Sequence, residues 1–508
     1  MPDSFTANMK LYRHLVLLGL AAVATGVRAE ERELNGWPVS VTHVNAAGQT
    51  VAWNSAGPLV FSRSAPEGGT QAGLRPVWVQ STDASGDLRA ALFLYPLFSY
   101  SADAETYKWS VLQLMNRTGR RAGAPARARS LENLGGFDVW PFWFSRDTGD
   151  AATSYRALFP VYGTMLHRLG YDRLSWTLWP LYFQSTTRGA TTTAMPWPFV
   201  RVTQGAAAGF ALWPLFGWQT RAGVSRQEFY LWPLGYNNTT QPAADARSGT
   251  PPKREYAILP FYAHASGPGY RGETFVWPLF GYTDRTVPER YHETRYLWPL
   301  LVQGLGPEHT VNRWAPFYTY SNLHGFEKTW IAWPLFREVH WTSEGVAQTK
   351  TQLLYFFYWS RVQRSPTNPK LPPASITHLW PLVSAWDNGA GQRQWQFPSP
   401  LEVFFPGNEK VRAAWTPLFS LVRYDQHAPG HVRTSLLWDG ITWERRDAER
   451  RTEFHLGPLF SVSASVDERR VAIANGLISW KRDATGTWRL FWLDFPSKPA
   501  NVAQPPVP

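Results

Sequence analysis

Few residues in this sequence have the types and spacing that catalysis or metal binding requires. His427 and His431 are four residues apart, but Pro429 and Gly430 lie between them and predict a turn rather than a helical face that would align both rings. No helical pattern follows the glycine-rich segment 267–272, so we interpret it as a turn and not as a dinucleotide site. The sequence therefore assigns no catalytic, cofactor-binding or metal-ligating residue, and no cofactor is expected.

Four carboxylates, Glu338, Glu344, Glu402 and Asp439, could in principle supply the acid and base of a glycosidase. Such a pair must face one cleft, about 5 to 9 Å apart, and sequence spacing does not show which two side chains meet. Ordinary surface charge is the better interpretation. The protein is expected to be non-enzymatic, and an exported polysaccharide hydrolase is the second alternative.

The balance of charges favours anionic partners. The chain has 50 lysines and arginines against 38 acidic residues, a formal net charge of +12. One expected surface loop contains five arginines and no acidic residue: Arg117, Arg120, Arg121, Arg127 and Arg129. This loop could contact a glycan or an anionic envelope polymer, although a solvated flexible loop is the simpler interpretation. Nucleic acid is not expected, because the aromatic residues that could stack on bases are assigned to the strands.

The elements that must carry these residues are indicated by a repeated motif, aromatic-Pro-Leu-aromatic. Intact copies begin at Trp179, Trp213, Trp277 and Trp333, and looser copies recur at spacings of 16 to 21 residues between Trp37 and Phe495. Where the spacing doubles, a proline-free segment occupies the missing position, at 109–115, 354–359 and 436–438. The chain is therefore expected to be one long repeat array.

The composition, with 28 Trp, 21 Tyr, 29 Phe, 41 Pro and 39 Gly, predicts an all-β fold of short strands and turns. With one turn in each of about 20 to 24 repeats, we expect an antiparallel meander rolled into a barrel or sandwich. A parallel β-solenoid is the alternative.

The prolines are interpreted as bends at the strand centres, because proline cannot donate to the ladder there. The expected structural core of the repeat is Trp179, Pro180, Trp213, Pro214, Trp277, Pro278, Trp333 and Pro334.

The N-terminal segment indicates export. Lys10 and Arg13 precede an apolar run that ends at Ala29, the pattern of a cleaved signal peptide over residues 1–29. Residues 30–495 are expected to form a single β-repeat domain, and residues 496–508 a disordered Pro-rich tail. The chain contains no cysteine, so neither a disulfide nor a thiolate site contributes.

These features favour an exported, non-catalytic scaffold or binding surface in the periplasm, in the outer membrane or outside a Gram-negative-type cell. The first alternative is an outer-membrane β-barrel in transport or assembly, with membrane association through strands and not helices. Against it, the apolar runs do not alternate as lipid-facing strands should. The sequence gives no oligomeric state.

Overall fold

A computed structural model describes residues 32–45, 49–65, 68–121, 135–242, 249–466, 468–482 and 485–494. These residues form one antiparallel sheet of 45 strands, in which each strand pairs with the strands before and after it in sequence. The expected all-β antiparallel meander is confirmed. The predicted signal peptide, residues 1–29, and the predicted tail, residues 496–508, lie outside the described residues.

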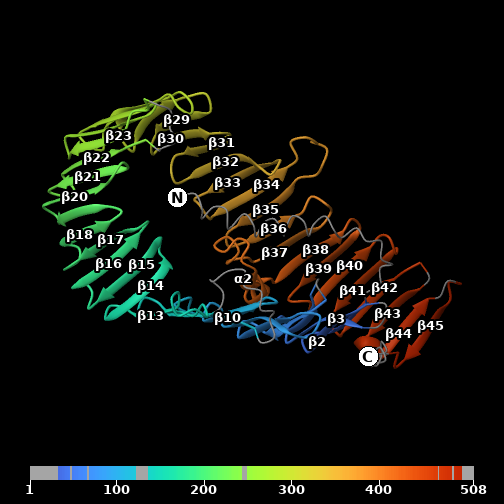
Figure 1. Cartoon of the computed structure of the whole chain (residues 1–508). Coiled ribbons are helices and arrows are strands. Elements are labelled where there is room, and N and C mark those ends of the chain that lie inside the picture. Colours follow the sequence, from blue (N-terminus) through green and yellow to red (C-terminus); the bar gives the residue numbers. More distant parts are fainter. Residues whose placement is uncertain are drawn as a thin grey trace.

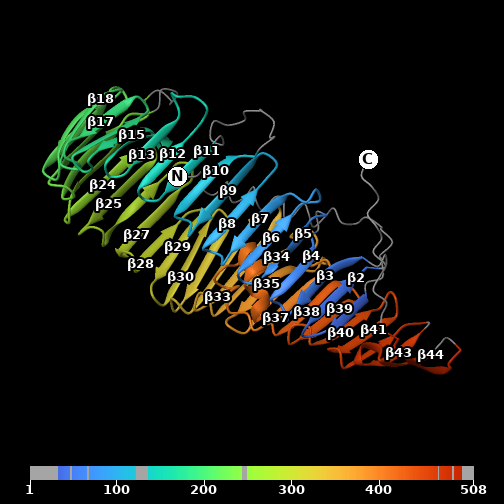
Figure 2. The same ribbon diagram turned by 90° about the horizontal axis from the view of Figure 1, so that it is seen from below.

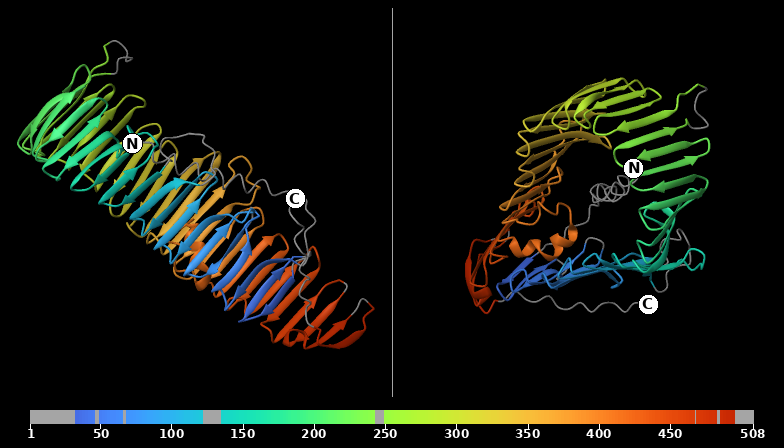
Figure 3. Two further views of the ribbon diagram at one scale, coloured as in Figure 1. Left: turned by 60° about the horizontal axis from the view of Figure 1, so that its bottom comes forward. Right: turned by 90° about the vertical axis from the view of Figure 1, so that its left-hand side faces the viewer.

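The sheet bends round on itself and encloses an interior (Figure 1; Figure 3, right). Strands β1 to β13 form its first side, in blue and cyan. Their bounds are β1 Arg32–Gly36, β2 Ser40–Val44, β3 Thr50–Ser55, β4 Val60–Ser64, β5 Thr70–Leu74, β6 Trp78–Thr82, β7 Leu88–Phe93, β8 Phe98–Ala102, β9 Thr106–Val111, β10 Met115–Arg120, β11 Gly135–Val139, β12 Trp143–Arg146 and β13 Tyr155–Leu158.

The next two sides are drawn in green and yellow in Figure 1. The second side consists of β14 Tyr162–Arg168, β15 Tyr171–Thr177, β16 Tyr182–Thr187, β17 Ala190–Ala194, β18 Val200–Gly205, β19 Ala208–Leu212, β20 Phe216–Arg221, β21 Ser225–Tyr230 and β22 Gly235–Thr240. The third consists of β23 Lys253–Ile258, β24 Tyr262–Gly267, β25 Tyr270–Phe275, β26 Phe280–Arg285, β27 Tyr291–Leu297, β28 Leu301–Leu305, β29 His309–Trp314 and β30 Tyr318–Leu323.

The fourth side returns to the first strands (Figure 2). Its strands are β31 Phe326–Ile331, β32 Phe336–Ser343, β33 Val346–Leu353, β34 Tyr358–Arg364, β35 Ala374–Leu379, β36 Val383–Asp387, β37 Arg393–Phe397, β38 Val422–Ala428, β39 His431–Leu436, β40 Ile441–Arg446, β41 Arg451–Leu456, β42 Phe460–Ala464, β43 Arg469–Ile473, β44 Ile478–Arg482 and β45 Trp488–Trp492. Two short helices, α2 Glu409–Ala414 and α3 Thr416–Phe419, lie between β37 and β38, and η1 Ala474–Gly476 precedes β44.

Each sequence repeat is a hairpin with two strands and two turns, and this corrects the expected position of the motif. Strand β15 ends at Thr177, the turn occupies 178–181, and β16 begins at Tyr182; a second turn at Arg188 and Gly189 leads to β17. The Trp179-Pro180 bond is cis, and the Leu181 N–H donates to the Leu178 carbonyl over 2.8 Å to close the turn. The Trp-Pro-Leu motif therefore lies between strands and not at strand centres, where a proline would interrupt the ladder.

All eight residues of the expected repeat core lie in such turns. None of the eight is buried, and Trp277 and Trp333 are 48% and 56% exposed. The proline-free segments follow the same plan, with turns at 112–114, 354–357 and 437–440. A run such as Phe275–Phe280 thus contains one strand end, a turn and one strand start, and this explains why it is continuously apolar.

The turns that follow odd-numbered strands lie along one edge of the sheet, because an antiparallel meander reverses direction at every strand. Neighbouring turns on this edge bond to one another: the Trp197 N–H donates to the Pro180 carbonyl, and the Trp232 N–H donates to the Pro214 carbonyl, both over 2.7 Å. We call this edge the apolar rim. The turns after even-numbered strands form the opposite, polar rim, where Gly189, Gly325 and Gly345 have positive φ.

The ends of the coil meet face to face and not by strand pairing, so the sheet does not close into a ring of hydrogen-bonded strands. Glu33 in β1 accepts a 2.7 Å hydrogen bond from the Thr442 hydroxyl of β40 and lies 3.0 Å from the Arg433 guanidinium of β39. Arg433 also contacts the Asp439 carboxylate at 2.9 Å, and the Asn35 amide donates to the Asp439 carbonyl. We call this buried group the clasp.

The helical segment adds a second contact across the interior. Ala413 and Ala414 of α2 pack against the buried side chains of Phe61, Val79 and Leu92 on β4, β6 and β7. The Trp415 indole N–H donates to the Tyr95 carbonyl over 2.8 Å, and the Arg75 guanidinium donates to the Ala413 carbonyl over 2.9 Å. Since Arg75 and Tyr95 belong to turns of the apolar rim, the rim of the first side lies beside that of the fourth.

The clasp predicts a large loss of stability when one partner is removed. Glu33→Gln leaves the Arg433 guanidinium, whose side chain is 13% exposed, without half of its carboxylate contacts. Urea denaturation is expected to show a free energy of unfolding lower by about 3 to 5 kcal/mol. The matched control, Arg445→Gln, removes an exposed ion pair with Asp447 and should cost at most about 1 kcal/mol. Equal effects of the two substitutions would contradict a stabilising clasp.

The clasp also predicts acid sensitivity. Burial, the largest single influence, would raise the pKa of Glu33, but the charges of Arg433, His43 and His455 and the Thr442 hydrogen bond together lower it to about 2. Burial would likewise raise the pKa of Glu444, but hydrogen bonding from His431 and Arg446 and the charges of Arg446 and Arg433 together lower it to about 2. A lowered folded pKa gives stability that is present above the ordinary value near 4.5 and is lost as pH falls toward 2. Denaturation followed between pH 5 and pH 2 should show this slope, and Glu33→Gln should flatten it.

Candidate functional site

Polar chemistry gathers on the face of the sheet that carries Glu33 at one end and Arg433 at the other, here called the inner face. Cross-strand partners share a face and alternate residues change face, so the pairing register assigns the inner-face residues along the whole sheet. Charged residues are distributed unevenly along it. At the clasp they are paired with acidic residues, whereas in two stretches farther along the cations outnumber the acidic residues of the inner face.

The first such stretch crosses β29 to β34 and consists of Arg313, Lys328, Arg337, Lys350 and Arg361, here called the cationic patch. No acidic side chain lies on the inner face of β28 to β37, strands that the structure describes in full, since Glu327, Glu338 and Asp387 occupy outward positions. Burial, followed by the charges of Arg337 and Arg361, lowers the pKa of Lys350. Like charges are thus held together in a partly desolvated place.

Tryptophans and glutamines position these cations. The Arg337 guanidinium lies 5.0 Å from the ring centre of Trp330, and the Lys350 ammonium lies 5.4 Å from that of Trp359. Buried Gln348 accepts a 2.9 Å hydrogen bond from the Arg361 Nε. The patch therefore combines fixed positive charge with aromatic faces, the two features that bind acidic groups and sugar rings.

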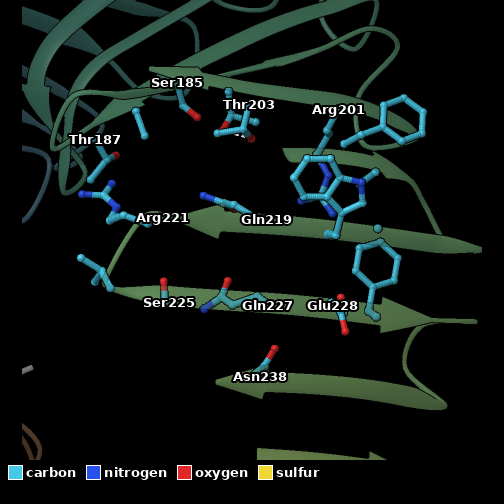
Figure 4. A pocket seen from close by; sticks show the side chains of 18 of the residues that line it. Ser185, Thr187, Arg201, Thr203, Gln219, Arg221, Ser225, Gln227, Glu228 and Asn238 are labelled. Atoms are coloured by element: carbon cyan, nitrogen blue, oxygen red, sulfur yellow. Dashed lines mark hydrogen bonds between the residues drawn. The ribbon is translucent and has the colours of Figure 1, made fainter. Parts of the chain in front are cut away.

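The second stretch is a hollow of about 750 Å³ over β15 to β22 (Figure 4). Its lining includes Arg201, Thr203, Gln219, Arg221 and Asn238. Glu228 is its single acidic residue, but the strand register directs the Glu228 side chain to the outer face, where it pairs with Arg226. Burial lowers the pKa of Arg201, and the Arg201 Nε is buried without a hydrogen-bond partner. Like the cationic patch, the hollow therefore carries an excess of positive charge on the inner face.

Gly217 leaves room for an aromatic ring in the lining of the hollow. A Cβ on Gly217 would lie 2.4 Å from Phe229 Cε1 and 2.6 Å from Ala211 Cβ, so the Phe229 ring occupies the space above this glycine. The Arg201 guanidinium lies 6.0 Å from that ring. Phe229 therefore forms an aromatic floor beside the unpaired arginine.

The predicted arginine loop is placed only in part. Arg127 and Arg129 lie outside the described residues. Arg117 and Arg120 belong to strand β10 and not to a loop, and alternation directs Arg117 outward and Arg120 inward. Arg121 is paired with Asp87 at 2.9 Å. The three described arginines therefore do not converge, because strand geometry separates residues that are close in sequence.

The four carboxylates considered for a glycosidase lie on separate parts of the fold. Glu338 faces outward on β32 beside His340, and Glu344 lies in a turn of the polar rim. Asp439 belongs to the clasp. Burial raises the pKa of Glu402, which accepts a 2.6 Å hydrogen bond from the Thr416 hydroxyl.

The other weak motifs are turns, as expected. Pro429 and Gly430 connect β38 to β39, and segment 267–272 crosses from β24 to β25. Sequence reasoning missed the cationic patch. Its members are separated by 9 to 15 residues, and only the strand register shows that they share a face.

The sequence matches no protein-family model, and no curated protein is significantly similar to it. In the described residues, no helix has the length and apolar character needed to cross a membrane. The fold and the inner face therefore define this chain as a coiled, single-sheet β-meander with an electropositive interior.

The packing at Gly217 predicts that a single methyl group disturbs the hollow. Gly217→Ala should displace Phe229 and lower the free energy of unfolding by about 1 to 3 kcal/mol, with a change in the near-ultraviolet circular dichroism of the aromatic residues. Gly267→Ala is the control, because its nearest neighbour is 3.5 Å away. Equal stability of the two variants would show that Phe229 does not occupy this space.

Proposed function

We propose that this protein is an exported, non-catalytic binding protein of the cell envelope whose inner face holds an acidic polysaccharide. The observation that carries the proposal is the cationic patch, in which five cations share the inner face of strands whose acidic residues all point outward. Burying like charges together is unfavourable unless a ligand neutralises them. A chain of acidic sugars supplies repeated negative charge.

The shape of the patch supports a polymer more than a small ion. The cations occur on β29, β31, β32, β33 and β34, and neighbouring strands are about 4.8 Å apart, so they extend along the sheet for roughly 25 Å. Trp330, Trp341 and Trp359 alternate with them and offer flat faces for sugar rings. The hollow at Arg201 and Arg221 extends the same chemistry to the second side.

The proposal includes export because of the N-terminal sequence. There a basic segment, an apolar run and Ala29 follow one another as in a signal peptide. Acidic polysaccharides are components of the compartments to which such a signal leads. A periplasmic or extracellular location is therefore part of the proposal, and fractionation of the expressing cells tests that part separately.

Dextran sulfate and uncharged dextran test the binding, because the two polymers share a backbone and differ in charge. We expect dextran sulfate to bind with an affinity that falls as salt is raised, and Lys350→Gln with Arg361→Gln to weaken binding by about 2 kcal/mol, or roughly thirtyfold. The measurement is isothermal titration calorimetry at two salt concentrations.

The matched control removes two cations from the outer face, Arg226→Gln with Arg271→Gln, where each arginine is exposed and paired with a glutamate. These substitutions make the same change in net charge and should leave the affinity within about threefold of the unsubstituted protein. Equal weakening by both pairs would mean that overall charge, and not the cationic patch, attracts the polymer, and the proposal would fail.

A further inference from the structure

The apolar rim is the largest feature that the proposed function does not use. On this rim, none of the tight turns between the β7–β8 turn and the β35–β36 turn contains Asp, Glu, Lys or Arg. Large apolar side chains project from these turns, and Phe261 and Phe317 are 72% and 75% exposed. The polar rim, in contrast, carries Asp83, Arg188 and Glu344 in its turns. The two edges of one sheet thus have opposite character.

Many backbone N–H groups of the apolar rim are already hydrogen-bonded. Successive turns bond through Trp N–H groups and Pro carbonyls, as Trp277 does to Pro260 over 2.6 Å and Trp333 to Pro316 over 2.7 Å. These groups therefore keep their hydrogen bonds in an apolar environment. Insertion of most loops is opposed by the burial of unpaired amides, and the paired N–H groups of this rim do not add that cost.

Arginines lie directly behind the rim on the inner face. Arg201 and Arg337 are each the second residue of a strand that leaves a rim turn, and Arg313 is the second-last residue of a strand that enters one. At about 3.3 Å per residue, they stand within roughly 7 Å of the turn. The Arg201 Nε and the Arg337 Nε are buried without hydrogen-bond partners.

We propose that the apolar rim docks on the surface of a lipid bilayer. Its turn side chains enter the part of the acyl-chain region next to the headgroups, and the arginines lie at the level of the lipid phosphates. This order of groups, apolar tips with tryptophans and then cations, is the one that an anionic bilayer surface complements. The coil then stands on the membrane by one edge.

The length of the rim favours a bilayer over a protein partner. Between β7 and β36 the edge extends for roughly 140 Å at about 4.8 Å per strand, far beyond the patch of a standard protein interface. The first and fourth sides lie alongside one another with their strands aligned (Figures 2 and 3), so a flat surface can meet both. Contacts of Arg75 with Ala413 and of Trp415 with Tyr95 hold these edges together.

Flotation of the full chain with vesicles tests the proposal. We expect binding to vesicles of phosphatidylcholine with phosphatidylglycerol and weaker binding to phosphatidylcholine alone. Phe261→Ser with Phe317→Ser should reduce the bound fraction at least tenfold, because each change removes an exposed ring from the inserted edge. Arg201→Gln should reduce the preference for the anionic vesicles.

The control substitutes two equally exposed apolar residues at the other edge. Leu169→Ser with Leu305→Ser alters side chains that are 74% and 72% exposed at the polar rim, and it should leave vesicle binding unchanged. Circular dichroism confirms that both double variants are folded.

Three outcomes would overturn the proposal. The first is no binding to either kind of vesicle, and the second is equal loss of binding in the two double variants. The third is that the unsubstituted protein sediments as an oligomer without lipid and that Phe261→Ser with Phe317→Ser makes it a monomer. The rim would then be an interface between copies of this chain. The dextran sulfate experiment is unaffected by these substitutions, so the two proposals fail separately.

Discussion

The structure depends on one constraint, the hydrogen bonding of each strand to its neighbours in sequence through the entire sheet. In an antiparallel meander, alternate turns must lie on opposite edges and alternate residues on opposite faces. The chain therefore has four distinct surfaces, two rims and two faces, and each can carry its own chemistry. The Trp-Pro-Leu turns occur once for every two strands and so place all their side chains on one edge.

The sheet has one layer over most of its length, and the described residues form only small buried clusters, such as the one around Phe144, Met165 and Trp176. Stability must then come largely from the ladder and from contacts where the coil overlaps. The clasp and the α2 helix supply those contacts. There the inner-face charges are paired as Glu33 with Arg433 and Glu444 with Arg446, whereas the strands of the cationic patch carry no acidic residue on this face. The same face thus has balanced charge at one end and an excess of positive charge elsewhere.

Much of the fold could be predicted from the sequence. The aromatic, Pro and Gly content indicated an all-β chain, and the regular motif indicated a meander in which proline-free segments occupy the same positions as the motif. The mistake concerned the place of the motif. Trp277 and Pro278 were expected inside a strand because the run around them is apolar. The run contains a strand end, a turn and a strand start, and it is apolar because all three lie at one rim. Proline, which cannot donate to a ladder, was the local evidence for a turn.

The sequence by itself determined the all-β class, the repeat and the antiparallel meander, because these depend on neighbouring residues. Only the tertiary structure decided which residues meet. Arg433 reaches Glu33 because the sheet bends through a full circuit, and Lys350 joins Arg361 because the strand register aligns them on one face. Curvature and register are sums of many small twists and pairings along the sheet, so no local pattern records them.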